Sequence, residues 1–485
     1  MAPLIWIFLA TLIGLYISRP IMDPDLWWHI VVGRWILSNG KIPDVDYWNM
    51  FGVGQPWIPY SWSNEIIFAF IEKNWGVSGL LVTQSILGVL LTGICMYVAG
   101  RIGKDHFFGA LLGIFIASAS EAHLSLRPQG ISWILLALML FISDDIARNG
   151  ISKKKLFFTG LLSCIWANSH LTAVLGVGMA SLWAFGGTRS RGEDIKSMLS
   201  VFAAGFLGCL ITPFFGAEML TLISKANHPF SFSLISEFQM ANISHHPVGI
   251  LIIGLTLLLL FIHFKPTVLS APRILVLGVT VIACLAVVKF LPMAAIVCAI
   301  ALATLWRERN EPKGIFGNLG ESFIRMEQLY SGKLKGPGFA VLLIAGILLQ
   351  YSRLAEDQKY VTQMQSKAFD FIFDNKLSGP ILNMFGDGGY LMYRLADADG
   401  KPSQLVAIDG RTNVNPPEIM AKFEKALDGQ QGWKEYLDAV NPQTVIWKSE
   451  APLVAILKER EDWKLVYQDT DVEKGHSVFQ KVPSL

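Results

Sequence analysis

Long apolar segments separated by short polar loops dominate the first 353 residues of the chain. A membrane-spanning helix needs roughly 20 predominantly apolar residues, or somewhat fewer when it is short or tilted. Eleven segments approach this length: 3–20, 77–99, 107–120, 130–147, 156–169, 171–187, 197–216, 247–264, 273–290, 292–306 and 338–353. The pattern predicts an α-helical polytopic membrane domain with about 11 transmembrane helices over residues 1–353, including a long first external loop at 21–76.

Short alternating segments replace the long apolar ones beyond residue 354. Five segments predict strands, at 381–385, 405–409, 444–447, 463–467 and 477–482, and five predict helices, at 369–375, 388–395, 417–427, 432–440 and 451–460. Such alternation predicts a small α/β domain with a sheet of about five strands. We therefore expect a second, C-terminal domain over residues 354–485.

Composition supports a membrane protein with two environments. The chain is 52% hydrophobic and only 16% charged, whereas soluble domains carry about 25% charged residues. Residues 1–353 contain 25 Lys and Arg against 18 Asp and Glu, and residues 354–485 contain 15 against 20. The net charge of +2 gives no reason to expect a nucleic-acid partner.

Basic residues predict the orientation of the spans. With a cytoplasmic N-terminus, the inside loops are 100–106, 148–155, 188–196, 265–273 and 307–336, which contain seventeen Lys and Arg, whereas the outside segments contain seven. This asymmetry follows the positive-inside rule. It places the first loop and the C-terminal α/β domain on the extracytoplasmic side.

The first loop contains the most informative residues of the chain. Up to Trp75 it holds seven of the fifteen tryptophans, together with the acidic residues Asp23, Asp25, Asp44, Asp46 and Glu65. Tryptophan prefers membrane–water interfaces, where its apolar ring and its N–H are both satisfied. Carboxylates beside such an interface are suited to binding a cation or accepting a proton, so the loop predicts a functional site at the membrane surface.

Pro24 predicts the first turn of an amphipathic helix over Asp25–Ser38 that lies along the interface, with Asp23 as its N-cap. Asp25 and His29 are four residues apart and share a face, which allows a hydrogen-bonded acid–base pair. The alternative interpretation is that Asp23 only caps the helix and that His29 only satisfies its neighbours.

Several motifs in chain order resemble those of prokaryotic polytopic proteins related to GT-C glycosyltransferases, and the first resembles more distantly the catalytic subunit of oligosaccharyltransferase. They are DPDLWWHIVVGRWILSNGKIPDVDYWN with QPWIPYSWSNE in the first loop, SLRPQ (125–129), WANSH (166–170), ISEF (235–238), NMFGDGGYLMYRL (383–395) and AIDGRTNV (407–414). The resemblance implies a GT-C-like membrane glycosyltransferase of the cell envelope, in the prokaryotic plasma membrane, that transfers a sugar from a polyprenyl-phosphate carrier to an acceptor.

Such a transfer needs a base for the incoming hydroxyl, and Asp25 or Asp23, assisted by His29, fits this task. Asp23 and Asp25 could also hold a divalent metal, Mg²⁺ or Mn²⁺, on the departing phosphate. Guanidinium groups match phosphate well, so Arg127 is the best candidate for binding it. The remaining candidates for substrate binding are His170, Asn168, Glu65 and Glu237. We expect Asp23, Asp25, Arg127 and His170 to converge on one cavity just outside the membrane core.

Two other functional classes remain open. A transporter or flippase of lipid-linked saccharides is disfavoured because the acidic residues cluster in one external loop and not at the bilayer midplane. A non-catalytic scaffold of the same fold is the other alternative. In the C-terminal domain, Asp409 and Arg411 follow a predicted strand. They could recognise the acceptor or fix the domain by an ion pair, and the sequence does not choose between these roles.

Overall fold

The computed structural model of the chain is described here over twelve stretches of sequence. They are residues 4–18, 23–187, 189–226, 230, 236–242, 249–250, 253–254, 256–257, 269–307, 367–411, 413–471 and 475–483. These residues form two compact units. One, the helical unit, comprises Met1–Ile21, Leu80–Met219 and Ser236–Asp357, and the other, the loop–tail unit, comprises Met22–Gly79, Leu220–Ile235 and Gln358–Leu485. The first loop and the C-terminal segment thus share one unit although hundreds of residues separate them.

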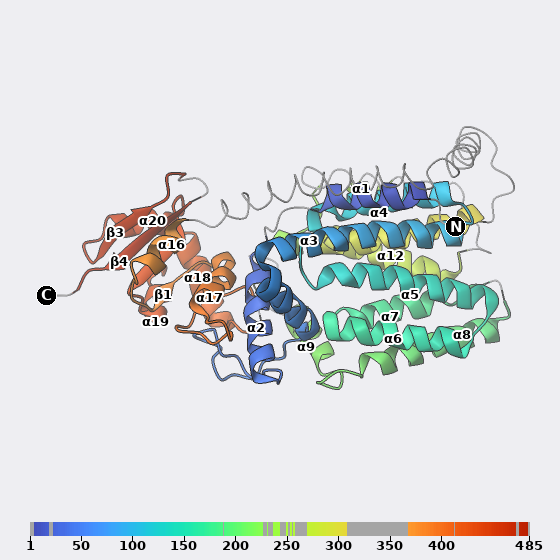
Figure 1. Cartoon of the computed structure of the whole chain (residues 1–485), viewed down its shortest axis with the longest axis horizontal. Helices are drawn as coiled ribbons and strands as arrows, with labels where there is room; N and C mark the ends of the chain where they lie inside the picture. The colour runs from blue at the N-terminus through green and yellow to red at the C-terminus, as the bar shows by residue number, and fades with distance from the viewer. Residues whose placement is uncertain are drawn as a thin grey trace. The chain divides into compact units, whose positions relative to one another are not determined.

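The helical unit is a bundle whose helices lie side by side (Figure 1). It is built from α1 (Leu4–Ile17), the second part of α3 (Trp62–Gly103), α4 (His106–Ser120), α5 (Gln129–Asn149), α6 (Lys153–Ser169), α7 (Ala173–Trp183), α8 (Arg191–Cys209), α12 (Ala271–Ala286) and α13 (Leu291–Arg307), with the short turns η1 (Glu121–His123), η2 (Ser236–Phe238) and η3 (Val288–Phe290). Another helix, α9 (Glu218–Ala226), begins in this unit. Buried side chains of α3, α5, α7 and α13 supply much of its core.

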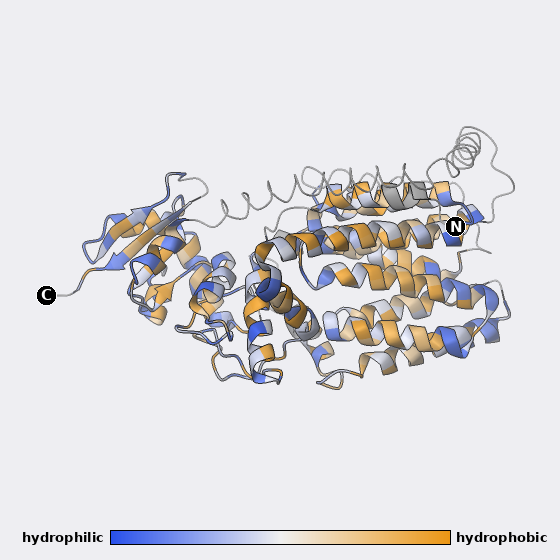
Figure 2. Cartoon of the chain, viewed as in Figure 1, coloured by the Kyte–Doolittle hydropathy of each residue, from blue (hydrophilic) through white to orange (hydrophobic). Residues whose placement is uncertain are grey.

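Three described helical segments are long and apolar enough to cross a membrane: Trp62–Gly103, Gln129–Asn149 and Val288–Arg307. Hydrophobic residues follow the helices of the bundle, whereas hydrophilic residues gather near helix ends (Figure 2). By length and composition, the helical unit is therefore a membrane domain. Of the eleven predicted spans, 338–353 lies outside the described residues and 247–264 lies mostly outside them. A count of about eleven stays a prediction.

The helix α3 is broken at Gly76, whose backbone angles (φ 60°, ψ −155°) are not helical. This region of φ and ψ is open essentially to glycine alone, because a Cβ atom would clash there. The segment before the break carries Glu65, Glu72 and Lys73, and the segment after it carries the apolar run predicted at 77–99. The two segments of α3, before and after the break, thus differ in polarity, and α3 contributes residues to both units.

The loop–tail unit contains a four-stranded mixed sheet in the order β1 (Ile381–Leu382), β2 (Thr444–Lys448), β4 (His476–Lys481), β3 (Trp463–Gln468). The pair β1–β2 is parallel, and β4 pairs antiparallel with both β2 and β3. Helices α16 (Lys367–Asp374), α17 (Gly388–Leu395), α18 (Pro417–Leu427), α19 (Lys434–Val440) and α20 (Pro452–Lys458) and the turn η5 (Phe385–Asp387) accompany the sheet. Trp447, Phe423 and Phe479 are buried in its core. The predicted α/β character of this region is confirmed.

One of the five predicted strands is wrong. Residues 405–409 form only single bridges, from Val406 to Asn49 and to Ile381. The backbone of this segment bonds to other partners: the side-chain oxygen of Asn383 accepts from the N–H of Ala407, its amide donates to the carbonyl of Ile408, and Val406 exchanges hydrogen bonds with Trp48 and Met50 of the first loop. These bonds replace a regular ladder.

The predicted amphipathic helix over Asp25–Ser38 exists as α2 (Asp25–Asn39), but its predicted amphipathic character is wrong. Leu26 through Gly33 are all buried, as are Trp35 and Ile36. Neighbours lie on more than one side of the helix: α2 packs against α17, and Gly33 lies against Glu65 of α3. Its tryptophans face protein neighbours: the ring of Trp27 contacts Tyr390 and Tyr393.

Candidate functional site

The acidic pair Asp23 and Asp25 lies at the N-terminus of α2. The prediction that Asp23 is the N-cap is wrong, because α2 begins at Asp25 and its N-cap residue is Pro24, with no side-chain capping hydrogen bond. Oδ1 of Asp23 still accepts a hydrogen bond from the backbone N–H of Asp25 at 3.0 Å, which satisfies one N–H of the first helical turn. Asp23 is buried, whereas Asp25 is half-buried. Of the two carboxylates, Asp25 is therefore the more accessible to a ligand.

A tail motif contacts this helix start within the loop–tail unit. A Cβ atom added at Gly410 would overlap the carboxylate of Asp25. The absence of a side chain at position 410 therefore lets the Asp409-Gly410-Arg411 turn approach α2 closely. The acidic pair of the first loop and the Asp-Gly-Arg motif of the tail form one local structure.

Arg411 is the centre of a buried ionic cluster beside the acidic pair. Its Nε and Nη2 donate to the two carboxylate oxygens of Asp409, each at 2.9 Å, and its Nη1 donates to Oδ1 of Asp46 at 2.7 Å. The amide of Asn49 donates to Asp409 at 3.1 Å and to Asn415 at 2.8 Å. These five residues are all buried. The role left open for Asp409 and Arg411 is thus an ion pair that joins the tail to the first loop.

Three tryptophans enclose the guanidinium of Arg411. The rings of Trp57, Trp48 and Trp28 have their centroids 4.7, 5.6 and 5.9 Å from its Cζ. Burial alone lowers the pKa of Arg411, but Asp409 and Asp46 outweigh this effect and raise it above its ordinary value. Burial likewise raises the pKa of Asp409, and Arg411 outweighs it to hold that pKa below its ordinary value. Arg411 and Asp409 therefore stay ionised.

Glu65 and His29 form a second buried pair in the loop–tail unit. Oε1 of Glu65 accepts from the hydroxyl of Ser61 at 2.9 Å and lies 3.2 Å from Nδ1 of His29. Oε2 of Glu65 is buried without a hydrogen-bond partner among the described residues. The absence of a side chain at Gly33 lets α2 approach α3 closely, because a Cβ atom at this position would overlap the carbonyl of Glu65. His29 thus contacts Glu65 of α3, which the four-residue spacing from Asp25 did not predict.

Arg127, Glu237 and Lys289 form a cluster in the helical unit. Nη1 of Arg127 donates to both carboxylate oxygens of Glu237, at 2.9 and 2.8 Å, and Nζ of Lys289 lies 2.9 Å from Oε2. The three side chains come from the turn before α5, from η2 and from η3. Their side-chain exposures are 13%, 25% and 26%, so the cluster is partly open to solvent.

Electrostatics leave this second cluster positive. Burial alone raises the pKa of the Glu237 carboxyl, but Lys289 and Arg127 outweigh it and lower that pKa to about 2. Two cations therefore face one permanent carboxylate. Among the described residues the cluster has two cations and one carboxylate, an arrangement suited to an anion such as a phosphate.

His170 and Asn168 end helix α6 and have different neighbours. Nδ1 of His170 lies 2.7 Å from the hydroxyl of Thr172, and the amide of Asn168 donates to the carbonyls of Cys164 and Ile211, both at 2.8 Å. These contacts satisfy polar groups at the end of α6 and tie it to the segment after α8. They give both residues a structural role.

The predicted site residues thus divide between the two units. Asp23, Asp25, His29 and Glu65 lie in the loop–tail unit, and Arg127, His170, Asn168 and Glu237 lie in the helical unit. The convergence of the two sets on one cavity stays a prediction. Sequence reasoning assigned no role to Asn49 and Asn415, and no local spacing signals that they join the Arg411 cluster.

The metal prediction can be compared with the donors present. Among the residues that the structure describes, no group of three or more His, Cys, Asp and Glu is placed to hold a metal ion. Asp23 and Asp25 offer two carboxylates, one of which is already engaged by a backbone N–H. Mg²⁺ is commonly held by one or two carboxylates together with water and substrate phosphate. The donor chemistry of the pair therefore fits Mg²⁺ or Mn²⁺.

No protein-family model matches the chain, and no curated protein matches it by sequence. Comparison of folds is informative. Over 92% of its length the chain is similar in fold to an archaeal oligosaccharyltransferase, which confirms, at the level of fold, the resemblance indicated by the motifs.

Two structures of the archaeal oligosaccharyltransferase from Archaeoglobus fulgidus show this likeness. One is AglB in complex with an inhibitory peptide and a dolichol-phosphate, with a TM-score of 0.52 and 9% sequence identity. The other is the apo form, with a TM-score of 0.53 and 10% identity. In both cases the similarity covers 92% of this chain and 69% of the other.

Proposed function

We propose that this protein is a membrane glycosyltransferase that moves a sugar from a polyprenyl-phosphate carrier to an acceptor on the extracytoplasmic face. The observation that carries the proposal is the half-buried Asp25 carboxylate at the start of α2, in a chain with the oligosaccharyltransferase fold over 92% of its length. Dolichol-phosphate, which one of these neighbours binds, is itself a polyprenyl phosphate. This supports the same class of donor for this chain.

The proposal includes a topology. About eleven spans, a cytoplasmic N-terminus and an extracytoplasmic first loop and tail follow from the distribution of Lys and Arg. The shared unit of the first loop and the C-terminal segment supports this arrangement, since both must then lie on the same side. A reporter fused after residue 485 should be active only outside the cytoplasm.

The residues suggest how the transfer would proceed. The acceptor oxygen attacks the anomeric carbon, the bond from that carbon to the phosphate oxygen breaks, and Asp25 takes the proton of the acceptor hydroxyl. Arg127 and Lys289 stabilise the phosphate that leaves with the polyprenyl chain. Asp23 holds the N-terminus of α2 and so positions Asp25. A divalent metal bound by the two aspartates would supply further positive charge for the leaving phosphate.

Replacing the aspartates tests the proposal. Asp25→Asn should lower the rate of sugar transfer about 10²–10⁴-fold, the usual cost of losing a general base. Asp23→Asn should lower the rate of transfer less, because the side-chain oxygen of asparagine can still accept the hydrogen bond from the backbone N–H of Asp25. Transfer from radiolabelled polyprenyl-phosphate sugar to endogenous acceptor in membranes measures both. Asp44→Asn, an exposed carboxylate of the same loop, is the matched control and should retain full activity.

A scaffold is the alternative function. The buried Arg411 cluster favours it in one respect, since it shows that acidic residues of this loop also serve as structural partners. Activity like that of the wild type in both asparagine variants, with Asp44→Asn unchanged, would remove Asp23 and Asp25 from catalysis. The scaffold would then be the better description.

A further inference from the structure

A basic pocket lies at the ends of three helices of the bundle, away from the residues assigned to sugar transfer. It has a volume of about 390 Å³ and is lined by the end of α3, the end of α5, the end of α13 and the start of α4. Its cations are Arg101, Lys104, Arg148 and Arg307, and its carboxylates are Asp144 and Asp145.

Both carboxylates have cationic partners from outside this lining. Asp144 pairs with Arg148 at 2.7 Å and also with Arg273 of α12 at 3.2 Å, and Asp145 pairs with Lys155 of α6 at 2.6 Å. Arg273 and Lys155 therefore add positive charge beside the pocket. Among the described residues, the cations in and beside the pocket therefore outnumber the carboxylates.

Asp105 is a further carboxylate at this end of the bundle. Its oxygens accept from the indole of Trp306 and from the backbone N–H of Phe108, both at 3.0 Å. The rings of Trp306 and Phe108 stack with centroids 4.2 Å apart. Asp105 thus joins α4 to α13 and fixes the walls of the pocket.

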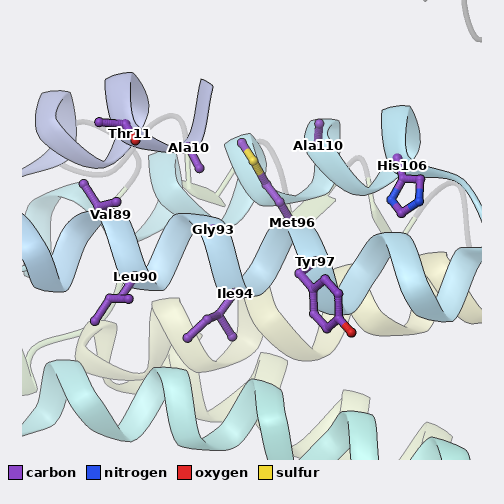
Figure 3. Close-up of a pocket in the computed structure, with 10 residues that line it drawn as sticks. All are labelled: Ala10, Thr11, Val89, Leu90, Gly93, Ile94, Met96, Tyr97, His106 and Ala110. Carbon is purple, nitrogen blue, oxygen red and sulfur yellow. The ribbon is translucent and has the colours of Figure 1, made fainter. Parts of the chain in front are cut away.

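An apolar groove, drawn in Figure 3, shares the lining residue His106 with the pocket. It has a volume of about 310 Å³ and lies between α1, α3 and α4, with Val89, Leu90, Gly93 and Met96 among its lining residues. His106 lines both the groove and the basic pocket. Tyr97 of the groove and Phe141 of the pocket are also in ring contact, with centroids 6.2 Å apart.

We propose that the groove and the pocket together bind one anionic phospholipid, with its phosphate headgroup among Arg101, Lys104 and Arg307 and an acyl chain along α3. Basic pockets between membrane helices match anionic headgroups through charge, and an acyl chain gains by covering apolar side chains. A soluble phosphate would use the cations but not the groove. Because His106 lines both the groove and the pocket, a ligand with a charged head and an apolar chain matches the two together better.

This site is separate from the proposed transfer chemistry. Arg127 lies just before the start of α5, whereas Arg148 and Asn149 lie at its end. At 1.5 Å per residue the helix spans roughly 30 Å, so variants at one end leave the other intact. Failure of the lipid proposal and failure of the glycosyltransferase proposal are therefore distinguishable.

Lipid binding by the full-length protein in detergent tests the proposal. Native mass spectrometry would follow phosphatidylglycerol and phosphatidylcholine in parallel titrations, and we expect the wild type to prefer phosphatidylglycerol. The double variant Arg101→Gln with Arg307→Gln should bind it about 30-fold more weakly, at about 1 kcal/mol for each basic side chain. Lys154→Gln with Arg191→Gln, which changes two exposed basic residues at the starts of α6 and α8, is the matched control and should bind as the wild type does.

The groove has its own variant. A Cβ at Gly93 has only an ordinary contact, with the side chain of Ala10, so Gly93→Leu should fold, fill the groove and weaken binding about tenfold. Glycerol 3-phosphate, the headgroup without acyl chains, should not displace the lipid. Thermal unfolding in phosphatidylcholine checks that each variant is folded. If the double variant Arg101→Gln with Arg307→Gln does not fold, Lys104→Gln takes its place.

Three results would overturn the proposal. The first is equal binding of the two lipids by the wild type. The second is unchanged phosphatidylglycerol binding in the folded pocket and groove variants. The third is displacement of the lipid by glycerol 3-phosphate at comparable concentrations, which would identify a site for soluble phosphate instead.

Discussion

The two ionic clusters of this protein are made from the same kinds of side chain, yet they differ in exposure and in charge. In the loop–tail unit, one guanidinium faces two carboxylates, and the side chains of Arg411, Asp46 and Asp409 are at most 1% exposed. In the helical unit, two cations face one carboxylate, and the side chains of Lys289 and Glu237 are about a quarter exposed.

The difference indicates different tasks. In the closed cluster, Asn49 and backbone N–H groups supply the donors that one guanidinium cannot, so every described oxygen of Asp46 and Asp409 has a partner. Nothing is left for a ligand to satisfy. The open cluster keeps an excess positive charge that an incoming anion can neutralise. Charge balance and exposure together distinguish the closed cluster, which has a structural role, from the open cluster, which is suited to binding a ligand.

The largest effect is expected from breaking the closed cluster. Arg411→Met should destabilise the protein by about 3–5 kcal/mol, because it leaves the carboxylates of Asp46 and Asp409 buried without their cation. Thermal unfolding followed by tryptophan fluorescence measures the loss, since Trp28, Trp48 and Trp57 surround the guanidinium.

The control is Arg460→Met, which removes an exposed ion pair with Asp462 and should cost at most about 1 kcal/mol. Equal losses in the two variants would contradict the structural role of the closed cluster.

An intermediate effect is expected at the open cluster, and on a different quantity. Arg127→Gln should raise the KM for the polyprenyl-phosphate donor about tenfold, since one charge-assisted contact to phosphate is worth about 1.5–3 kcal/mol at most. Stability should change by only about 1 kcal/mol, because Glu237 keeps its ion pair with Lys289.

Steady-state transfer kinetics and thermal unfolding of the same preparation separate the two effects. Arg189→Gln, at an exposed ion pair with Glu193, provides the control. An unchanged KM combined with a large loss of stability would make Arg127 a structural residue like Arg411.

The smallest effect concerns a third pair of intermediate exposure, His476 and Asp387, whose side chains are 9% and 17% exposed. Burial alone lowers the pKa of His476, but Asp387, 3.0 Å away, outweighs it and raises that pKa above 6.5. The folded state therefore binds the proton more tightly than the unfolded state. The stabilisation is complete below about pH 6.5 and is lost as the pH rises through the folded pKa.

The ion pair should contribute about 1 kcal/mol to the free energy of unfolding. The melting temperature should therefore fall between about pH 6 and pH 9, roughly the range above an ordinary histidine pKa. His476→Gln should flatten this part of the profile. A melting temperature of the wild type that rises over the same pH range would contradict the raised pKa of His476.

Local signals in the sequence were sufficient for much of the fold. The helices α17 and α18 begin and end where the sequence predicted, because Pro416 and Pro417 mark the start of α18 and a glycine pair opens α17. The strands β2, β3 and β4 were found from their runs of β-branched and aromatic residues. Segment 405–409 has the same composition, but side-chain bonds from Asn383 replace its ladder.

Long-range pairing was beyond sequence reasoning. The residues of the first loop were predicted to form a functional cluster, but the neighbours that bury most of α2, among them α17 and α3, are not indicated by any local pattern. Asp46 and Arg411 illustrate the limit: each is an ordinary polar residue in its own neighbourhood, and their pairing depends on the folded chain. By contrast, Arg127 and Glu237 both lie between predicted spans in segments expected outside, so the predicted topology already places them on one side of the membrane.

The pairing of Asp46 with Arg411 also has a consequence for biosynthesis. These residues are 365 positions apart, and a ribosome adds roughly 5–20 residues per second. The first loop therefore waits roughly 20–70 s after its own synthesis before its partner exists. During that interval Trp28, Trp48 and Trp57 lack the guanidinium around which they pack. A chaperone or the membrane surface itself must shelter them, and a nascent chain that stops before residue 411 presents an unfinished apolar surface to the cell's proteases.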